Sequence, residues 1–348
     1  MTSPVRGTPS IAVLVLNLNG RHFLDDCFQS LLRIKAPRFD IYLIDNHSSD
    51  SSVLHTRAGY PMVNIIENER NYGFAGAYDR VIRDLDHDYV VLLNNDTKVD
   101  EKWLSALYEV AETSSRTAAC GSKILTMWDK TLVDHAGGML TLIGSGHDVG
   151  KWTKDRSEDN VPVEMGFGCG CSLLIKRKVY LEVGGFDPDY IIYHEDVDLC
   201  WKMRLFGYSV MYVPESVVYH HLGGGTVRSI ENPWKAYLCQ KNRLANIIKN
   251  MGPGMLVSAL LVSLAYDAVR SARYILLRRG DLFKVLLRGY AETMGNLKKL
   301  LKDRRRVQSR RTVSDRDLRR FFFPLISSAF EYRRLLDPER QGSEAERN

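Results

Sequence analysis

The sequence lacks the cysteine spacing of a redox or zinc site. Its six cysteines, in 348 residues, include no CxxC pair and no repeated metal-ligand spacing. Two of them, Cys169 and Cys171, flank a glycine inside an apolar segment. Free cysteines are often buried as small hydrophobic side chains. We therefore expect buried free thiols.

Long apolar runs are also scarce. The first ten residues are polar, and the apolar run that follows is short and contains asparagines. A secretory signal is not expected, so the chain is predicted to begin in the cytoplasm. Near the C-terminus, the run 255–266 stops at Asp267. It is shorter than the roughly 20 residues that span a bilayer, so we expect it not to cross a membrane.

Positive charge is concentrated in the C-terminal part. The net charge is +6, yet residues 270–320 hold 17 Lys and Arg against five Asp and Glu. No recognition motif accompanies this charge, so nucleic acid is a poor partner. Basic helices with apolar and aromatic residues fit the surface of an anionic membrane. The alternative is a helical subdomain with a solvated basic face, which could form a homo-oligomer.

Four apolar strands are predicted, at 11–16, 41–44, 62–67 and 89–93, each ending in polar residues before a helix. Alternating strands and helices indicate a parallel α/β sheet. Ligands of such sheets bind outside the carboxyl ends of the strands. Polar residues at these ends should therefore share one rim. These rim residues are Asn17, Asn19, Asp45, Asn71, Gly73, Asn95 and Asp96.

Asp96 has the sharpest chemical setting on this rim. It follows a hydrophobic strand and lies among asparagines and a threonine, an oxygen-rich environment that suits Mg²⁺ or Mn²⁺ held together with substrate phosphates. Asp45 could form ordinary Asx turns or accept hydrogen bonds from a nucleobase or ribose. Gly73 and Gly76 could admit a phosphate, although their spacing is neither a P-loop nor a dinucleotide fingerprint.

Three acids, Glu195, Asp196 and Asp198, stand at the head of a predicted helix. Acids in a first turn are stabilised by the helix dipole, which could explain them without any chemistry. A glycine-rich segment precedes them, however, and a strand ending at His220 and His221 follows. A carboxylate at the end of an element, beside a metal-ligand histidine, is placed for general-base catalysis.

The stretch 120–164 is less regular. Its segments 134–138 and 144–148 contain His, Asp and several glycines. They could form a second metal site. A glycine-rich, hairpin-bearing insertion beside the site explains them as well.

Eight short segments together resemble family 2 inverting glycosyltransferases with the GT-A fold, and more closely the bacterial branch that includes rhamnosyltransferases. The resemblance covers about residues 10–226. It rests on the segments 16–20, 44–50, 71–76, 93–97, 168–170, 184–187, 194–199 and 218–221. It implies an α/β fold in residues 1–228, with a mixed, mainly parallel sheet flanked by helices. A helical, membrane-associated extension is expected in residues 229–348.

The resemblance also implies roles for the rim residues. Asp45 is expected to contact the nucleotide base of the donor, with Asn17 on the same loop. Asp96 takes the place of the last acid of the family's DxD metal motif, although the first acid is replaced by Asn94. His220 resembles the additional histidine on the metal side, and His221 is its competitor for that role.

Asp196 matches the catalytic base of the family's Glu-Asp pair, with Glu195 in support and Asp198 as a helix-stabilising neighbour. The family often has arginine where this chain has Lys202. Lysine cannot form a bidentate fork, so a phosphate clamp at this position is in doubt. The residues expected to shape the acceptor side are Gly168, Gly170 and Asp187.

The implied activity is metal-dependent, inverting transfer of a sugar from a nucleotide-diphosphate donor. The acceptor would be a hydroxyl of a glycan or of a polyprenyl-diphosphate-linked glycan in cell-envelope polysaccharide assembly, at the inner face of the cell membrane. Rhamnose from dTDP-rhamnose is the leading donor, and a UDP-hexose or UDP-N-acetylhexosamine is the alternative. A non-catalytic nucleotide-sugar binding protein would lack the base, whereas Asp196 is present. A nucleotidyltransferase would have a glycine-rich basic loop where this chain has residues 17–20.

Overall fold

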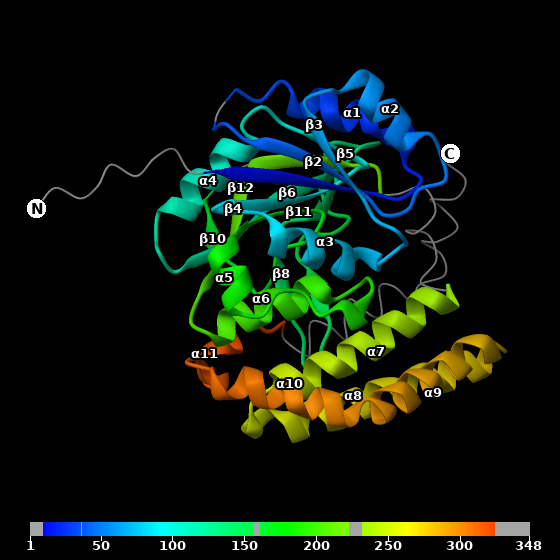
Figure 1. Cartoon of the computed structure of the whole chain (residues 1–348). Helices are drawn as coiled ribbons and strands as arrows, with labels where there is room; N and C mark the ends of the chain where they lie inside the picture. Colours follow the sequence, from blue (N-terminus) through cyan, green and yellow to red (C-terminus); the bar gives the residue numbers. More distant parts are fainter. Residues whose placement is uncertain (1–9, 36, 156–160, 223–231, 324–348) are drawn as a thin grey trace, which may run out of the picture.

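A computed structural model describes residues 10–35, 37–155, 161–222 and 232–323. The expected domain boundary at residue 228 lies outside these residues. A twisted sheet flanked by helices forms the upper part of the molecule, and the C-terminal helices form a layer below it (Figure 1).

The four predicted strands form one half of the sheet. They are β1 (Ile11–Asn17), β2 (Asp40–Asp45), β3 (Val63–Glu67) and β4 (Tyr89–Asn94). All pair in parallel, in the order β3-β2-β1-β4. Their ends differ from the predicted ends by at most one residue, and their carboxyl ends meet at one edge, as expected.

The other half of the sheet is mixed. β11 (Ser172–Lys176) lies antiparallel between β4 and β6 (Thr117–Thr126), and β12 (Ser209–His220) runs parallel to β6. Three short strands pair with this half of the sheet. β5 (Thr97–Val99) and β10 (Val163–Glu164) pair with β12, and β7 (Val133–His135) pairs with β6. This mixed, mainly parallel sheet confirms the predicted fold class.

Helices bury both faces of the sheet, which explains why its strands are continuous apolar runs. On β1, Val13 and Val15 pack with the helix side chains of one core, and Ala12 and Leu14 with those of the other. The first core is formed with α1 (Arg21–Leu31) and α4 (Trp103–Glu112), and α2 (Ser52–Gly59) lies beside α1. The second is formed with α3 (Gly73–Asp84), α5 (Arg177–Glu182) and α6 (Glu195–Leu205).

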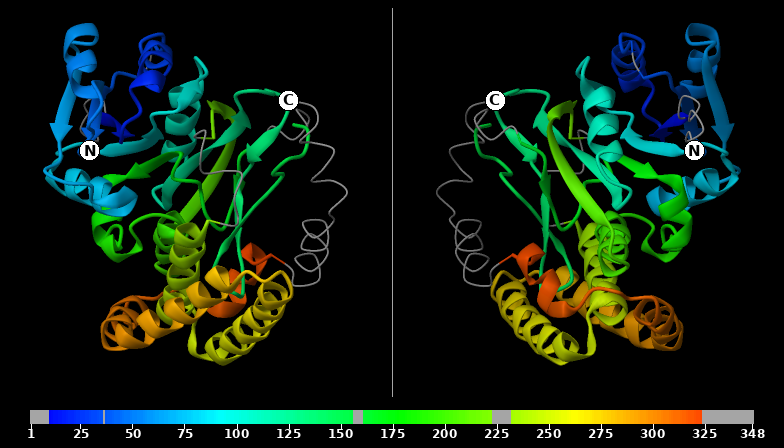
Figure 2. Two further views of the ribbon diagram at one scale, coloured as in Figure 1. Left: turned by 90° about the vertical axis from the view of Figure 1, so that its right-hand side faces the viewer. Right: turned by 90° about the vertical axis from the view of Figure 1, so that its left-hand side faces the viewer.

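A hairpin projects from the sheet toward the C-terminal helices. Its strands are β8 (Gly138–Leu140) and β9 (Gly146–Asp148), and Figure 2 shows it reaching the lower layer. The hairpin alternative for this stretch is therefore confirmed. The six cysteines are all free, four of them buried and two partly buried, which agrees with the expected thiols.

The C-terminal helices are α7 (Pro233–Asn250), α8 (Pro253–Leu276), α9 (Gly280–Gly295), α10 (Leu297–Ser309) and the short α11 (Asp315–Leu318). The start of α7 is fixed by its sequence, because Asn232 accepts hydrogen bonds from the backbone N–H groups of Trp234 and Lys235 and proline follows at the first helical position. The first residues of α8 likewise include a proline.

The apolar run 255–266 is part of a helix that is longer than the run itself. α8 has 24 residues, of which only Ala259, Ser263 and Asp267 are buried. The helix continues through Asp267 because this carboxylate is buried and paired with Arg243 and Arg270. By length and composition alone, α8 could cross a membrane.

Candidate active site

Side-chain amides connect the ends of β1, β2 and β4. Asn17 is the register partner of Asp45, and its Nδ2 donates to the Asp45 carboxylate at 3.2 Å and to Ser48 Oγ at 3.1 Å. Nδ2 of Asn95 donates in turn to Oδ1 of Asn17 at 2.6 Å. Three of the predicted rim residues therefore lie together in one hydrogen-bonded group.

Asn19 shapes the adjacent turn. Its φ is +53°, and its Oδ1 accepts hydrogen bonds from the backbone N–H groups of Ser49 at 2.7 Å and Asp50 at 3.3 Å. The amide oxygen of Asn19 is thus occupied within the protein. Its position fixes the loop after β1 against the loop after β2.

Asn71 and Gly73 form the next part of the rim. Oδ1 of Asn71 accepts hydrogen bonds from Asn46 Nδ2 and from the backbone N–H of Gly73, both at 2.8 Å. Gly73 has a φ of +71°, and a Cβ added there would lie 2.6 Å from the carbonyl oxygen of Ile191. Only glycine suits this position, where the segment after β3 touches the segment before α6.

Asp96 is paired with His220 across the sheet. Nε2 of His220 lies 3.3 Å from Oδ1 of Asp96, and Nδ1 lies 3.0 Å from Oδ2 of Asp134. The other oxygen of Asp134 is 3.0 Å from Lys151 Nζ. Burial lowers the pKa of His220, but Cys171, Asp134 and Asp96 together raise it well above its ordinary value. The imidazole is therefore held between two carboxylates.

The two histidines at the end of β12 have different surroundings. His220 faces Asp96, whereas the ring of His221 lies 3.9 Å from Asp26 and packs near Phe23. The backbone N–H of His221, rather than its ring, bonds to the carbonyl oxygen of Asp96 at 2.9 Å. Of the two, His220 is the side chain that could hold a cation together with Asp96.

The donor set fits a cation that also takes ligands from its substrate. Mg²⁺ and Mn²⁺ are commonly held by one or two protein groups together with phosphates. A metal-binding imidazole usually donates its second N–H to a carboxylate, as His220 can to Asp134. Among the described residues, no group of three or more His, Cys, Asp or Glu could hold a metal. In that stretch, His135 lies 2.9 Å from Asp148, and Asp134 pairs with His220 and Lys151.

Asp196 lies at the same edge of the sheet. Its Oδ2 accepts a hydrogen bond from the backbone N–H of Gly170 at 3.0 Å, and its Oδ1 accepts one from Val197 at 2.8 Å. Gly170 directly precedes Cys171, whose carbonyl oxygen accepts from the backbone N–H of Asn94 at 3.0 Å. The carboxylate of Asp196 is thus connected, through one short backbone segment, to the end of β4.

The two acids at the head of α6 differ in their hydrogen bonds. Burial raises the pKa of Asp196, although its two backbone N–H donors oppose this. Burial and the neighbouring Asp196 raise the pKa of Glu195 well above its ordinary value, and Oε2 of Glu195 is buried without a hydrogen-bond partner. With two backbone N–H donors, Asp196 is better placed than Glu195 to carry a negative charge and so to accept a proton.

Asp198 belongs to a buried ion cluster. Its carboxylate lies 2.9 Å from Lys202 Nζ and 3.1 Å from Lys249 Nζ, and it accepts from Asn250 at 2.9 Å. Burial opposes its ionisation, but the two lysines hold its pKa below the ordinary value. Lys202 also donates to the carbonyl oxygen of Gly185 at 2.7 Å. The side chains of Asp198 and Lys202 are thus both engaged in contacts inside the protein.

The three residues expected on the acceptor side do not lie together. Gly170 contacts Asp196, and a Cβ added there would lie 2.8 Å from the ring of Phe74. Gly168 packs against Gly121 of β6. Asp187 instead lies 3.1 Å from Lys249 and 3.5 Å from Lys299, in a cavity of about 380 Å³ beside the C-terminal helices.

Two of the residues that hold this site were not predicted in these roles from the sequence. Asp134 was considered only as part of a second metal site, and its partner His220 is 86 residues away. Asn242 hydrogen bonds to the loop before α6 from about 50 residues away. Neither contact leaves a local pattern in the sequence.

Comparisons with known proteins agree with this geometry. Residues 10–184 match the family model of glycosyl transferase family 2. Over 210 residues, the chain is 30% identical to an N-acetylglucosaminyl-diphospho-decaprenol L-rhamnosyltransferase of Mycobacterium tuberculosis (strain CDC 1551 / Oshkosh). This match covers 54% of the chain and 68% of the relative.

Solved structures share the fold at low sequence identity. A structure of GalNAc-T7 with UDP, GalNAc and Mn²⁺ matches 70% of this chain with a TM-score of 0.57 and 18% identity, although the match spans only 48% of that protein. The mannosyltransferase PcManGT from Pyrobaculum calidifontis, in complex with GDP-Man and Mn²⁺, matches 87% of this chain and 86% of its own, with a TM-score of 0.52 and 14% identity. The sheet, the site and the family match lead to one conclusion: the chain belongs to glycosyl transferase family 2 and has the GT-A fold.

Proposed function

We propose that this glycosyltransferase transfers rhamnose from dTDP-rhamnose to a hydroxyl of a glycan carried on a polyprenyl diphosphate, with inversion and with a divalent cation. The proposed reaction type rests on the carboxylate of Asp196, which accepts hydrogen bonds from two backbone N–H groups. It lies at the edge of the sheet where Asp45 and Asp96 also lie. The sugar and the acceptor class are supported by the 30% identical relative, which is a decaprenol-linked rhamnosyltransferase.

The donor nucleotide would lie along the ends of β1 and β2. Asp45 already accepts hydrogen bonds from Asn17 Nδ2 and from the backbone N–H of Ser48. An ionised carboxylate has about four lone-pair positions, so it can still accept an N–H from a nucleobase. Asn46, which follows Asp45 directly, donates to Asn71 Oδ1 and to the carbonyl oxygen of Gly73, so the rim beside the donor is held by contacts within the protein.

Asp96 and His220 would hold Mg²⁺ or Mn²⁺, and Asp134 would fix the orientation of the imidazole. When bound, the cation neutralises the charge that develops on the diphosphate leaving group. Asp96 would supply a carboxylate oxygen and His220 its Nε2, the two atoms that face each other at 3.3 Å.

Asp196 would act as the general base. The acceptor hydroxyl must come within about 3 Å of the carboxylate to lose its proton. As the proton moves to Asp196, the acceptor oxygen forms a bond to the anomeric carbon and the bond from that carbon to the diphosphate breaks. A single displacement from the opposite face inverts the anomeric configuration. Burial raises the pKa of Glu195, which would leave the negative charge on Asp196.

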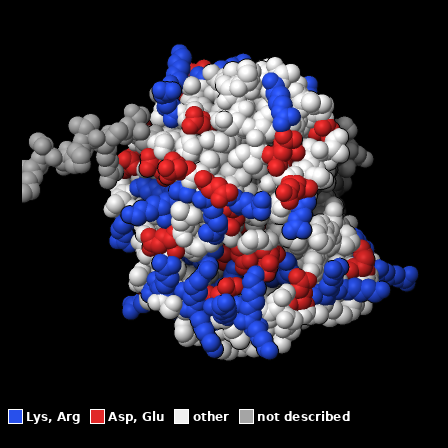
Figure 3. All heavy atoms as spheres, viewed as in Figure 1, with Lys and Arg blue, Asp and Glu red and all other residues white. Residues whose placement is uncertain are grey.

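We also propose that the protein binds the inner face of the cell membrane through α8. Val257, Leu261 and Leu264 follow the spacing of one helical stripe and are more than half exposed. On the face shown in Figure 3, Lys and Arg side chains gather over the lower part of the molecule, where the C-terminal helices lie. An apolar stripe beside basic residues is the surface expected for binding to anionic lipid.

The buried side of α8 favours an orientation parallel to the membrane. Asp267 is buried, accepts hydrogen bonds from Gln240 Nε2 and Tyr290 OH, and pairs with Arg243 and Arg270. A spanning helix would have to remove this carboxylate from its partners, and an unpaired charge in the membrane is costly. α8 would therefore lie on the surface with its apolar stripe in the lipid.

Replacing Asp196 by Asn should reduce transfer by about 10²–10⁴-fold, because the general base is lost. The assay measures nucleoside diphosphate release from a panel of dTDP- and UDP-sugars with Mn²⁺ and a polyprenyl-diphosphate acceptor. We expect dTDP-rhamnose to react. Since burial raises the pKa of Asp196, wild-type activity should be lost on acidification at a higher pH than an ordinary aspartate would give.

Asp129→Asn is the matched control, because Asp129 caps a local turn through Thr131. It should retain wild-type activity. An Asp196→Asn protein that remains fully active would show that another group accepts the proton. If a UDP-hexose reacts in place of dTDP-rhamnose, the proposed sugar is wrong although the reaction type stands.

Replacing Asp134 by Asn should weaken Mn²⁺ binding by about 10–100-fold, because His220 loses the carboxylate that orients it. Electron paramagnetic resonance of free Mn²⁺, titrated in the presence of dTDP, measures this affinity without turnover. Asp129→Asn should bind as the wild type does. Equal affinity of the Asp134→Asn protein would contradict the assignment of His220 as a ligand.

The double variant Leu261→Glu with Leu264→Glu should no longer float with vesicles that contain phosphatidylglycerol. The wild type should float, and less so at high salt, because the basic residues contribute through screened electrostatic attraction. Leu54→Glu, which changes an exposed leucine on α2, is the control and should float. A wild type that stays at the bottom, or a double variant that floats equally well, would exclude this surface.

A further inference from the structure

The loop that leads into the two acids of α6 has an unusual backbone. Ile191, Tyr193 and His194 have φ values of +62°, +74° and +65°. Side chains that are β-branched or bulky rarely adopt such a conformation, and it persists only where the surrounding structure holds it. The contacts of this loop therefore decide where α6, and with it Asp196, begins.

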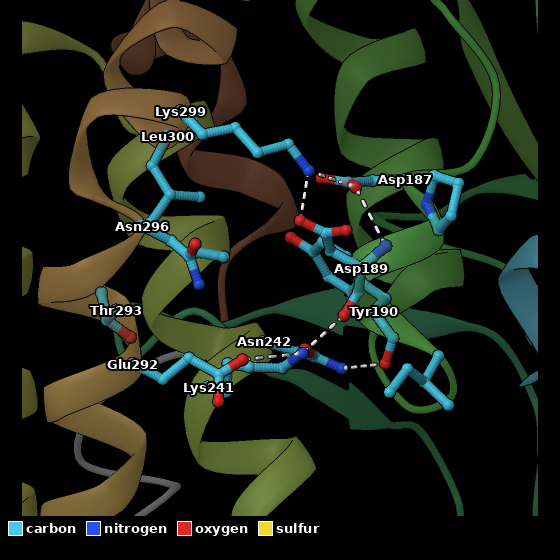
Figure 4. A pocket seen from close by; sticks show the side chains of 13 residues that line it. Asp187, Asp189, Tyr190, Lys241, Asn242, Glu292, Thr293, Asn296, Lys299 and Leu300 are labelled. Atoms are coloured by element: carbon cyan, nitrogen blue, oxygen red, sulfur yellow. Dashed lines mark hydrogen bonds and ion pairs between the residues drawn. The ribbon is translucent and has the colours of Figure 1, made fainter.

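One side chain contacts three carbonyl oxygens of this loop. Asn242 of α7 is buried, and its Nδ2 lies 2.9 Å from the carbonyl oxygen of Tyr190, 3.1 Å from that of Ile192 and 2.7 Å from that of Tyr193. Its two N–H groups are therefore shared among three acceptors. Figure 4 shows Asn242 directed from α7 toward the backbone at Tyr190. α7 lies outside the residues that match the family model, which end at 184.

The same loop touches the predicted donor side. The carbonyl oxygen of Ile191 accepts hydrogen bonds from the backbone N–H groups of Phe74 at 2.6 Å and Ala75 at 3.0 Å, directly after Gly73. The loop thus joins the first turn of α3 to the start of α6. A movement of this loop would change the distance between the donor and Asp196.

α7 also holds the two ends of this segment. Asn246 accepts from the hydroxyl of Tyr190 at 2.5 Å and donates to the carbonyl oxygen of Gly144 at 2.9 Å. Further along α7, Asn250 donates to Asp198 at 2.9 Å. The polar face of α7 therefore contacts the loop, the hairpin and α6 at once.

We propose that Asn242 is a positioning residue for the transfer reaction: its amide clamps the loop 190–194, so that this C-terminal helix completes the active site of the preceding domain. Asn242 does not itself reach the reacting atoms. It would act through the loop, by fixing Asp196 against the bound donor. The inference rests on the proposed transferase function.

The test compares Asn242→Ala with the wild type, using the donor that the wild type turns over. A misplacement of about 1 Å can cost about 10²-fold in rate, so we expect kcat to fall by up to that factor while the KM for the donor changes much less. Gln308→Ala is the matched control, because Gln308 also donates from a side-chain amide to two carbonyl oxygens, those of Lys249 and Asn250. It should keep the wild-type kcat.

The pH profile separates positioning from a general loss of stability. The charged or titratable groups near Asp196 include Glu195, Asp148, His135, Cys169 and Cys200, and none of them is changed in the variant. If the loop loosens and water reaches the carboxylate, the acid limb of kcat should move to lower pH. A protein that is only less stable would keep the limb of the wild type.

Several outcomes would overturn the inference. Asn242→Ala that is folded and has the kcat and acid limb of the wild type would do so, as would an equal loss in Gln308→Ala. Should Asn242→Ala fail to fold, Asn242→Ser is tested instead, because its side chain retains a hydrogen-bond donor. The inference then requires a kcat below that of the wild type and an acid limb at lower pH. Wild-type values would again refute the clamp. A wild type inert with every donor refutes the proposed function instead.

Discussion

The backbone N–H of Gly170 donates a hydrogen bond to the carboxylate of Asp196, and the site depends on this connection between the sheet and α6. This hydrogen bond joins the end of the sheet to the first turn of α6 at 3.0 Å. A carboxylate taken out of water needs such donors to remain ionisable. Only a residue without a side chain leaves room there, because a Cβ on Gly170 would meet the ring of Phe74 at 2.8 Å. This contact is held by the glycine-rich segment that contains Gly170, by the loop that precedes α6, and by α7.

Much of the fold follows directly from the sequence. β1 to β4 are apolar on both faces, because each face packs against helices, and such strands are visible as continuous apolar runs. Since parallel strands align their carboxyl ends, the sequence alone is enough to place Asn17, Asp45 and Asp96 on one rim. The pairing of Asp96 with His220 was suggested only by the family resemblance, and the geometry agrees with it at 3.3 Å.

Other features depend on contacts between distant residues and could not be read from local patterns. Asp187 was predicted as a loop acid on the acceptor side, and its pairing with two lysines of the C-terminal helices could not be predicted from the sequence. The length of α8 was missed because Asp267 looks like the end of an apolar run, whereas its charge is compensated by Arg243 and Arg270. Asp134 and Asn242 act on partners 86 and about 50 residues away.

The central claim is a single displacement assisted by Asp196, and the stereochemistry of the product tests it most directly. Proton nuclear magnetic resonance of the glycan formed from dTDP-rhamnose, or from the donor that reacts, gives the anomeric configuration of the new bond. The account predicts a configuration opposite to that of the donor. Retention of the donor's configuration would require two displacements or attack from the same face, and would contradict the role assigned to Asp196.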